Sequence, residues 1–178
     1  MEHPFLSMIK KVPGFLPEAF LTAKGVLYSG VYEATDLATG KNYVQIKTPA
    51  DKEVHFRITG GGSTQGPVNI KKYKGANLTN GTTPVPLFNR KHPKHDAGDT
   101  PDTEVYSDPS SVDVSGLDSF NGGFIPAGGK SVKMGSVLSL GFENILSAGT
   151  DYVIEIDNQS GGTIDILKIG FEFFEVAK

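Results

Sequence analysis

The sequence predicts an all-β protein, an antiparallel β-sandwich for which a jelly roll is the topology that fits best. Three observations predict it. Short runs alternate apolar and polar side chains with a period of two. Clusters of glycine, asparagine and serine separate these runs, which recur about every ten residues, as is typical of sandwiches and barrels. The 22 glycines and 11 prolines leave little room for long helices.

The first two strands predicted along the chain span residues 42–47 and 52–58. Each has one apolar and one wetter face, as expected for an antiparallel sheet with one buried side. The apolar faces carry Val44, Ile46, Val54, Phe56 and Ile58. The wetter faces carry Tyr43, Gln45, Lys47, Glu53, His55 and Arg57.

Two later strands are predicted over residues 151–157 and 163–176. In the first, Tyr152, Ile154 and Ile156 alternate with Val153, Glu155 and Asp157. In the second, Ile164 and Ile166 share the even face, after which the odd face holds Leu167, Ile169, Phe171 and Phe173. This change of phase predicts a bulge or bend near Leu167. Residues 136–149 are interrupted by Gly141 and are interpreted as strand and loop rather than helix.

The first twenty residues differ from the rest, and we divide the chain into an extended N-terminal arm, residues 1–20, and a β-sandwich domain, residues 21–178. The arm is rich in large apolar side chains, but its three prolines prevent a regular long helix. It either packs on the core of its own domain or docks on another subunit. For a docking arm, the candidate contact residues are Phe5, Leu6, Met8 and Ile9.

Composition argues against several classes of function. The length of 178 residues suits one domain that needs no disulfides, and a net charge of -3 does not favour nucleic-acid binding. The basic run of Lys71, Lys72 and Lys74 is interpreted as a solvated strand edge or loop. The lack of cysteine excludes thiol catalysis and is typical of a protein made in a reducing cytosol. We recognise no secretory signal or membrane-spanning stretch, and expect neither export nor a membrane partner.

The stretch 87–111 is the most suggestive of a chemical site, because His92 and His95 are followed by Asp96, Asp99 and Asp102. Proline and glycine interrupt it, so nothing in the sequence fixes both imidazoles on one side, as a metal site requires. We interpret it as a solvated polar loop and predict no bound metal or cofactor.

Other catalytic patterns also fail. The segment "GGFIPAGGKS" resembles the end of a phosphate-binding loop, but Phe124 stands where that loop needs its first glycine. Glu172 and Glu175 lie on opposite faces of their predicted strand, which disfavours a glycosidase pair. The sequence therefore favours a non-enzymatic protein with no catalytic residues.

Several stretches, in order, resemble a family of small virion structural proteins of tailed bacteriophages. The resemblance runs from about residue 21 to the end, and its most particular elements are the pair Asn89-Arg90 and the turn "YSDPS" at 106–110. The other stretches are "LYSGVYEATDL", "YVQIKTPADKEVHFRITGGG", "TPVPLFNRKH", "FIPAGGKSVKMGS", "LSAGTDYVIEIDNQSGG" and "IGFEFFEV".

The resemblance implies a virion component made in the bacterial cytoplasm, and we expect a decoration or cement protein on the capsid exterior. The expected partners are the major capsid protein and further copies of the chain, a trimer being one option. A tail or head-fibre component is an alternative. A carbohydrate-binding module is the main rival of another class, with a surface glycan as ligand and Tyr43, Tyr73 or Tyr106 as its platform. A hydrolase using the histidine loop ranks third.

Overall fold

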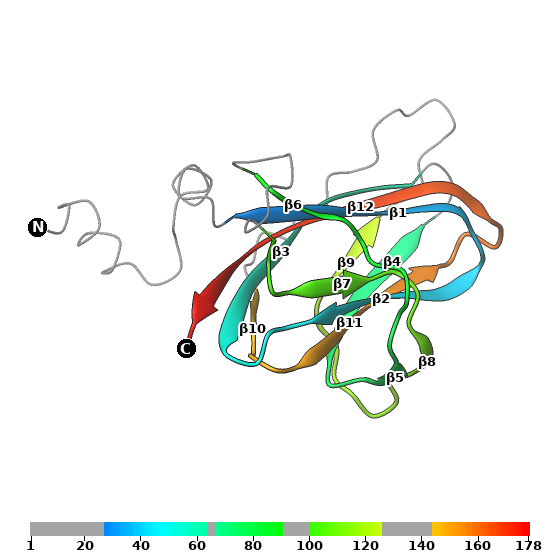
Figure 1. The fold of residues 1–178 in the computed structure, drawn as a ribbon. Helices are drawn as coiled ribbons and strands as arrows, with labels where there is room; N and C mark the ends of the chain where they lie inside the picture. Colours follow the sequence, from blue (N-terminus) through cyan, green and yellow to red (C-terminus); the bar gives the residue numbers. More distant parts are fainter. Residues whose placement is uncertain (1–26, 64–66, 91–99, 126–143) are drawn as a thin grey trace, which may run out of the picture.

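The computed structural model describes residues 27–63, 67–90, 100–125 and 144–178, and this part of the chain is an antiparallel β-sandwich (Figure 1). Sheet A has the strand order β10-β3-β12-β1-β6, and sheet B the order β7-β2-β11-β4-β9. The predicted all-β sandwich is therefore confirmed. The boundary predicted at residues 20/21 lies outside the described residues. No helix able to span a membrane occurs in the part of the chain that is described.

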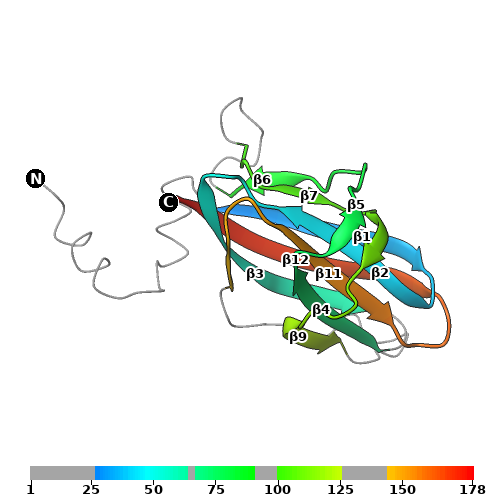
Figure 2. The same ribbon diagram turned by 90° about the horizontal axis from the view of Figure 1, so that it is seen from below.

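The strands of sheet A are β1 (Tyr28–Leu37), β3 (Lys52–Ser63), β6 (Leu87–Asn89), β10 (Asn144–Leu146) and β12 (Ile164–Ala177). Those of sheet B are β2 (Gly40–Lys47), β4 (Val68–Lys74), β7 (Glu104–Tyr106), β9 (Phe120–Ile125) and β11 (Asp151–Asn158). A short ribbon of β5 (Asn77–Thr79) and β8 (Ser110–Asp113) lies on the side of sheet B that faces away from sheet A (Figures 1 and 2).

Strand pairing is nested along the chain. β1 pairs with β12 and β2 with β11, and inside these pairs β3 joins β10 and β4 joins β9. Successive strands β1 to β4 alternate between the two sheets, and so do β9 to β12. The short strands β6 and β7 then extend the sheets beside β1 and β2. Contacts that hold the sandwich are therefore mostly between residues far apart in sequence.

The core lies between the two sheets and confirms the predicted inward faces of residues 42–47 and 52–58. Its aromatic centre is Phe56, whose ring stacks on Phe171 at 5.7 Å and on Phe173 at 6.3 Å between centroids. Gly30 on the neighbouring β1 leaves room for this cluster. A Cβ there would lie 2.5 Å from Cε2 of Phe171, so a larger residue would force the ring to move.

The predicted change of phase in the last strand is confirmed, but it lies before Leu167. Ile164 and Leu167 are both buried, whereas Asp165 and Ile166 between them are exposed. The sequence predicted that Ile164 and Ile166 share one face. That prediction was wrong, because Ile164 is buried and Ile166 is exposed. In the pairing with β3, the register instead shifts between Gly170 and Phe171.

The outer face of sheet B is more buried than we predicted from the polar residues on it. Gln45 and Glu155 were assigned to wetter faces, yet both are fully buried. Residues 80–81 lie over Gln45, whose Nε2 donates to Oδ1 of Asn80 at 2.8 Å and whose Oε1 accepts from the Gly81 amide at 3.0 Å. The Glu155 carboxylate pairs with Lys41 Nζ at 2.9 Å. Gln45 is thus matched by a flanking segment, whereas Glu155 depends on an ion pair with the neighbouring strand β2, and its Oε1 has no hydrogen-bond partner among the described residues.

The prediction of a solvated basic run was wrong for Lys72. This side chain is 2% exposed, because β4 pairs it with Ile154 and Phe120, which places it among core-facing positions. Its Nζ lies 5.6 Å from the centroid of the Phe120 ring and has no hydrogen-bond partner among the described residues. Burial lowers the pKa of this amine to about 8, since water no longer stabilises its charged form.

Candidate docking face

All of the large apolar side chains found exposed in the described residues lie on one surface, the outer face of sheet A. They come from four strands, and their exposed fractions range from 40% to 60%. We call this surface the docking face and define its apolar set as Val31, Phe88, Ile145, Ile166 and Val176. Exposed apolar residues are ordinary when scattered singly, but their restriction to one sheet face is typical of an interaction surface.

Strand register explains how these residues meet on one face. In β10, Ile145 projects outward because both of its neighbours are buried, and it pairs with His55 of β3. His55 in turn pairs with Phe174 of β12, and the two rings stack with centroids 4.4 Å apart. One apolar and aromatic row therefore crosses three adjacent strands, although its members are far apart in the sequence.

A second row across the face is polar and already paired. Arg57 donates from Nε to Oε2 of Glu172 at 2.9 Å, and its Nη2 contacts the same oxygen. Arg90 donates from Nη1 to Oε1 of Glu172 at 2.6 Å. Farther along the strands, Lys168 pairs with Glu33 at 2.8 Å. Because these charges are satisfied within the face, a partner can cover them without leaving an isolated ion.

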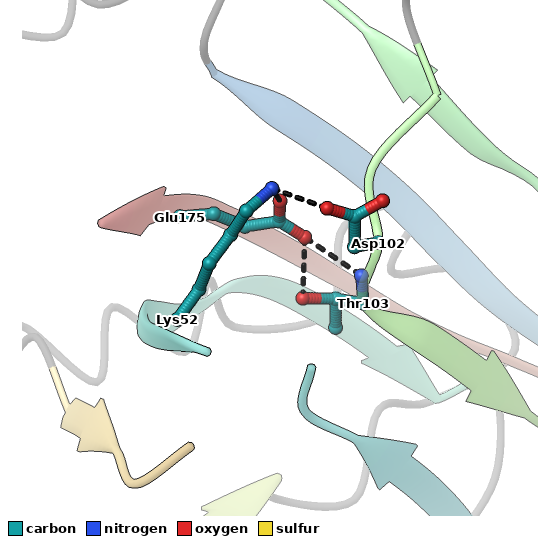
Figure 3. Close-up of polar contacts among 4 residues, drawn as sticks. All are labelled: Lys52, Asp102, Thr103 and Glu175. Carbon is teal, nitrogen blue, oxygen red and sulfur yellow. Dashed lines mark hydrogen bonds and ion pairs between the residues drawn. The ribbon is translucent and has the colours of Figure 1, made fainter. Parts of the chain in front are cut away.

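A separate polar cluster joins the two sheets at the end of β12 (Figure 3). The Glu175 carboxylate accepts from the amide and the hydroxyl of Thr103 at 2.7 and 2.8 Å, and its other oxygen lies 3.1 Å from Lys52 Nζ. Lys52 also contacts Asp102, and hydrogen bonds to Asp102 and Glu175 raise the pKa of its amine. We call these four residues the clamp. They fix the segment before β7 to sheet A.

Among the residues that the sequence singled out as chemical candidates, Asp102 lies in the described ranges. It is a member of the clamp, and no group of three potential metal-ligating side chains occurs in those ranges. His92, His95, Asp96 and Asp99 lie outside those ranges. So do the predicted arm contacts Phe5, Leu6, Met8 and Ile9, and they stay predictions.

Glu172 and Glu175 do occupy opposite faces of β12, as predicted, since the first pairs on the docking face and the second in the clamp.

The three tyrosines of the carbohydrate-binding alternative do not all reach the surface. Tyr73 is buried, whereas Tyr43 and Tyr106 are half-buried. Together they do not form an exposed aromatic platform.

The "YSDPS" turn and the pair Asn89-Arg90 have structural roles. Asp108 in the turn accepts from the amides of Thr82 and Thr83 at 3.0 and 2.9 Å, and these bonds lower the pKa of its carboxyl group. Asn89 is buried at the end of β6, while Arg90 reaches the docking face. The turn is therefore joined to residues 82–83, and Arg90 joins the end of β6 to β12.

The chain matches no protein-family model, and comparisons with curated proteins and with solved structures found no similar protein. The fold and its surfaces describe a β-sandwich whose outer face on sheet A carries exposed apolar side chains and ion-paired charges. This face was not predicted from the sequence, although one signal pointed to it. Ile166 and Val176 sit on even positions of a strand whose odd positions face the core after Leu167.

Proposed function

We propose that this protein is a non-enzymatic structural component of a bacteriophage virion, a decoration protein that binds the major capsid protein on the outside of the head. The observation that carries the proposal is the docking face, because exposed apolar side chains gathered on one sheet face serve adhesion rather than turnover. The resemblance of residues 21–178 to phage virion proteins supports the particle as its setting. A tail or head-fibre position is the alternative within the same class.

We also propose that the sandwich is a jelly roll. Its eight main strands form four nested antiparallel pairs that alternate between the sheets, as two interlocked Greek keys would. Jelly rolls recur in viral capsid proteins and in lectins. The proposed architecture thus agrees with a role in a virus particle.

The proposed contact with the capsid is made by the N-terminal arm through Phe5, Leu6, Met8 and Ile9. These side chains precede β1, which lies inside sheet A between β12 and β6. Burial of a large apolar side chain contributes about 1.5–3 kcal/mol. Four such residues could therefore dominate a standard interface of about 800 Å² on each partner.

The test is co-sedimentation of the purified protein with phage heads assembled without it. Replacing all four arm residues with serine should reduce bound protein by about a hundredfold or more, since roughly 3 kcal/mol of lost binding energy already has that effect. The matched control replaces Lys10 and Lys11 of the same arm with serine, which removes charge but keeps the apolar groups. The control should still bind.

Two results would refute this role. If the four-serine variant bound heads as well as the unaltered protein, the arm would not be the contact. If the unaltered protein bound purified tails and ignored heads, the alternative placement in the tail would replace the capsid assignment. Far-UV circular dichroism of each variant should retain a β-sheet spectrum, which separates lost binding from lost folding.

A further inference from the structure

The docking face has no cover among the described residues, and its composition defines what would fit it. Ile145 and Val176 flank the His55–Phe174 stack, and Phe88 and Val31 lie toward the β1–β6 edge. All strands beneath this surface are hydrogen-bonded to neighbours over the central part of the sheet. A cover must therefore bind through apolar side chains, because the backbone below offers few free donors or acceptors.

The part of the chain just before β1 has the matching chemistry. Residues 12–21, "VPGFLPEAFL", carry Phe15, Leu16, Phe20 and Leu21 with a single charged residue, Glu18. Pro13 and Pro17 lack amide donors, so this stretch is unsuited to a helix interior or a central strand. It is suited to lying across a sheet face as an extended, side-chain-mediated cover.

The described chain begins next to the docking face. The chain enters sheet A at Tyr28, which pairs with Phe173, and the following residue of β12, Phe174, belongs to the docking face. Leu27, immediately before β1, is 3% exposed although it does not belong to the core cluster between the sheets. Leu27 is therefore an apolar side chain that is shielded from solvent at the point where the described chain begins.

The length of the tether allows the contact. Phe20 is seven residues from Leu27 and Phe15 is twelve, which correspond to reaches of up to about 23 and 40 Å for an extended chain. The residues of β12 from Ile166 to Val176 span about 33 Å. A tether of this length gives the segment a local concentration in the millimolar range at its own sheet, which favours it over a second copy.

We propose that residues 12–21 of the same chain dock on the docking face, with Phe15, Leu16 and Phe20 as the anchoring side chains. The cover converts an exposed apolar sheet into a buried layer. It leaves Phe5, Leu6, Met8 and Ile9 at the far end of the arm, where the capsid contact is proposed, so the docking face serves adhesion by holding the arm rather than by touching the capsid itself. The inference concerns the isolated protein, and its test does not depend on the capsid contact.

Thiol labelling tests the proposal, because the chain has no cysteine of its own. Two full-length reporters are made, Ile145→Cys on the docking face and Asn77→Cys on the exposed ribbon strand β5. Each is combined with Phe15→Ser, Leu16→Ser and Phe20→Ser, or with the matched control Glu18→Ser and Lys24→Ser. The measured quantity is the rate of reaction with a maleimide dye over about a hundredfold range of protein concentration.

The triple substitution should speed labelling at position 145 about tenfold, the change expected if the segment covers the face about 90% of the time. Labelling at position 77 should stay constant, the control pair should have no effect, and no rate should depend on concentration. Equal rates at position 145 with and without the anchors would overturn the proposal. A rate that rises on dilution would assign the cover to a second copy, and a parallel rise at both positions would show a general loss of folding; either result contradicts it.

Discussion

Lys72 places an amine inside the sandwich, where its Nζ lies over the face of the Phe120 ring and has no hydrogen-bond partner among the described residues. Its pKa is lowered to about 8 from an ordinary value of 10.5, so the folded protein binds this proton less tightly than the unfolded chain does. The cost is present in full below pH 8, where both states are protonated. It disappears as the pH rises from 8 to 10.5, because the folded state then no longer carries the charge.

Lys72→Met should therefore stabilise the fold by about 3 kcal/mol at pH 7, the equivalent of this pKa difference. The gain should shrink steadily between pH 8 and 10.5. Urea unfolding of both proteins at several pH values measures it. The matched control is Lys74→Met, because Lys74 belongs to the same strand but is exposed. A Lys72→Met gain that does not change with pH would show that packing, and not the buried charge, determines the effect.

The clamp attaches a three-residue strand to the sandwich. β7 pairs with β2 over only Gln45 to Lys47, so its position depends on contacts outside the ladder. Glu175 provides them from the end of β12 by accepting both the amide and the hydroxyl of the buried Thr103. A strand of this length has little stability of its own.

Glu175→Ala should destabilise the protein by about 2 kcal/mol, since it leaves the buried Thr103 amide without its acceptor. Amide hydrogen exchange should accelerate in β7 and remain slow in β11. Asp102→Asn is the matched control, because the Asp102 side chain is 60% exposed and its ion pair with Lys52 contributes less than about 1 kcal/mol. Unchanged exchange in β7 after Glu175→Ala would mean that the pairing with β2 alone holds this strand.

Local alternation was sufficient to predict much of the sandwich. The inward positions of residues 42–47 and 52–58 were correct, because a period of two fixes which side chains share a face. The burial of Glu155 and Lys72 could not be predicted in this way. Each depends on neighbouring strands and segments: Glu155 on Lys41, and Lys72 on Ile154 and Phe120. Polarity alone assigned both side chains to solvent.

The docking face could not be predicted from the sequence for a related reason. Ile145 and Phe88 belong to three-residue strands too short to show a period, and strand order alone brings them onto one sheet. The segment with His92 and His95, in contrast, was a candidate site on composition alone. Asp102, the residue of that acidic run which the structure describes, stabilises the clamp. Clustering in sequence was a poor guide to clustering in space.

Adhesion by a β-sandwich to a capsid is tested most directly by electron cryomicroscopy of the native phage at side-chain resolution. We expect density for the two five-stranded sheets on the exterior of the head. Residues 5–9 should contact the major capsid protein, and Phe15, Leu16 and Phe20 should lie over Ile145 and Phe174. Density for this chain confined to the tail, or its absence from the particle, would contradict the proposed function.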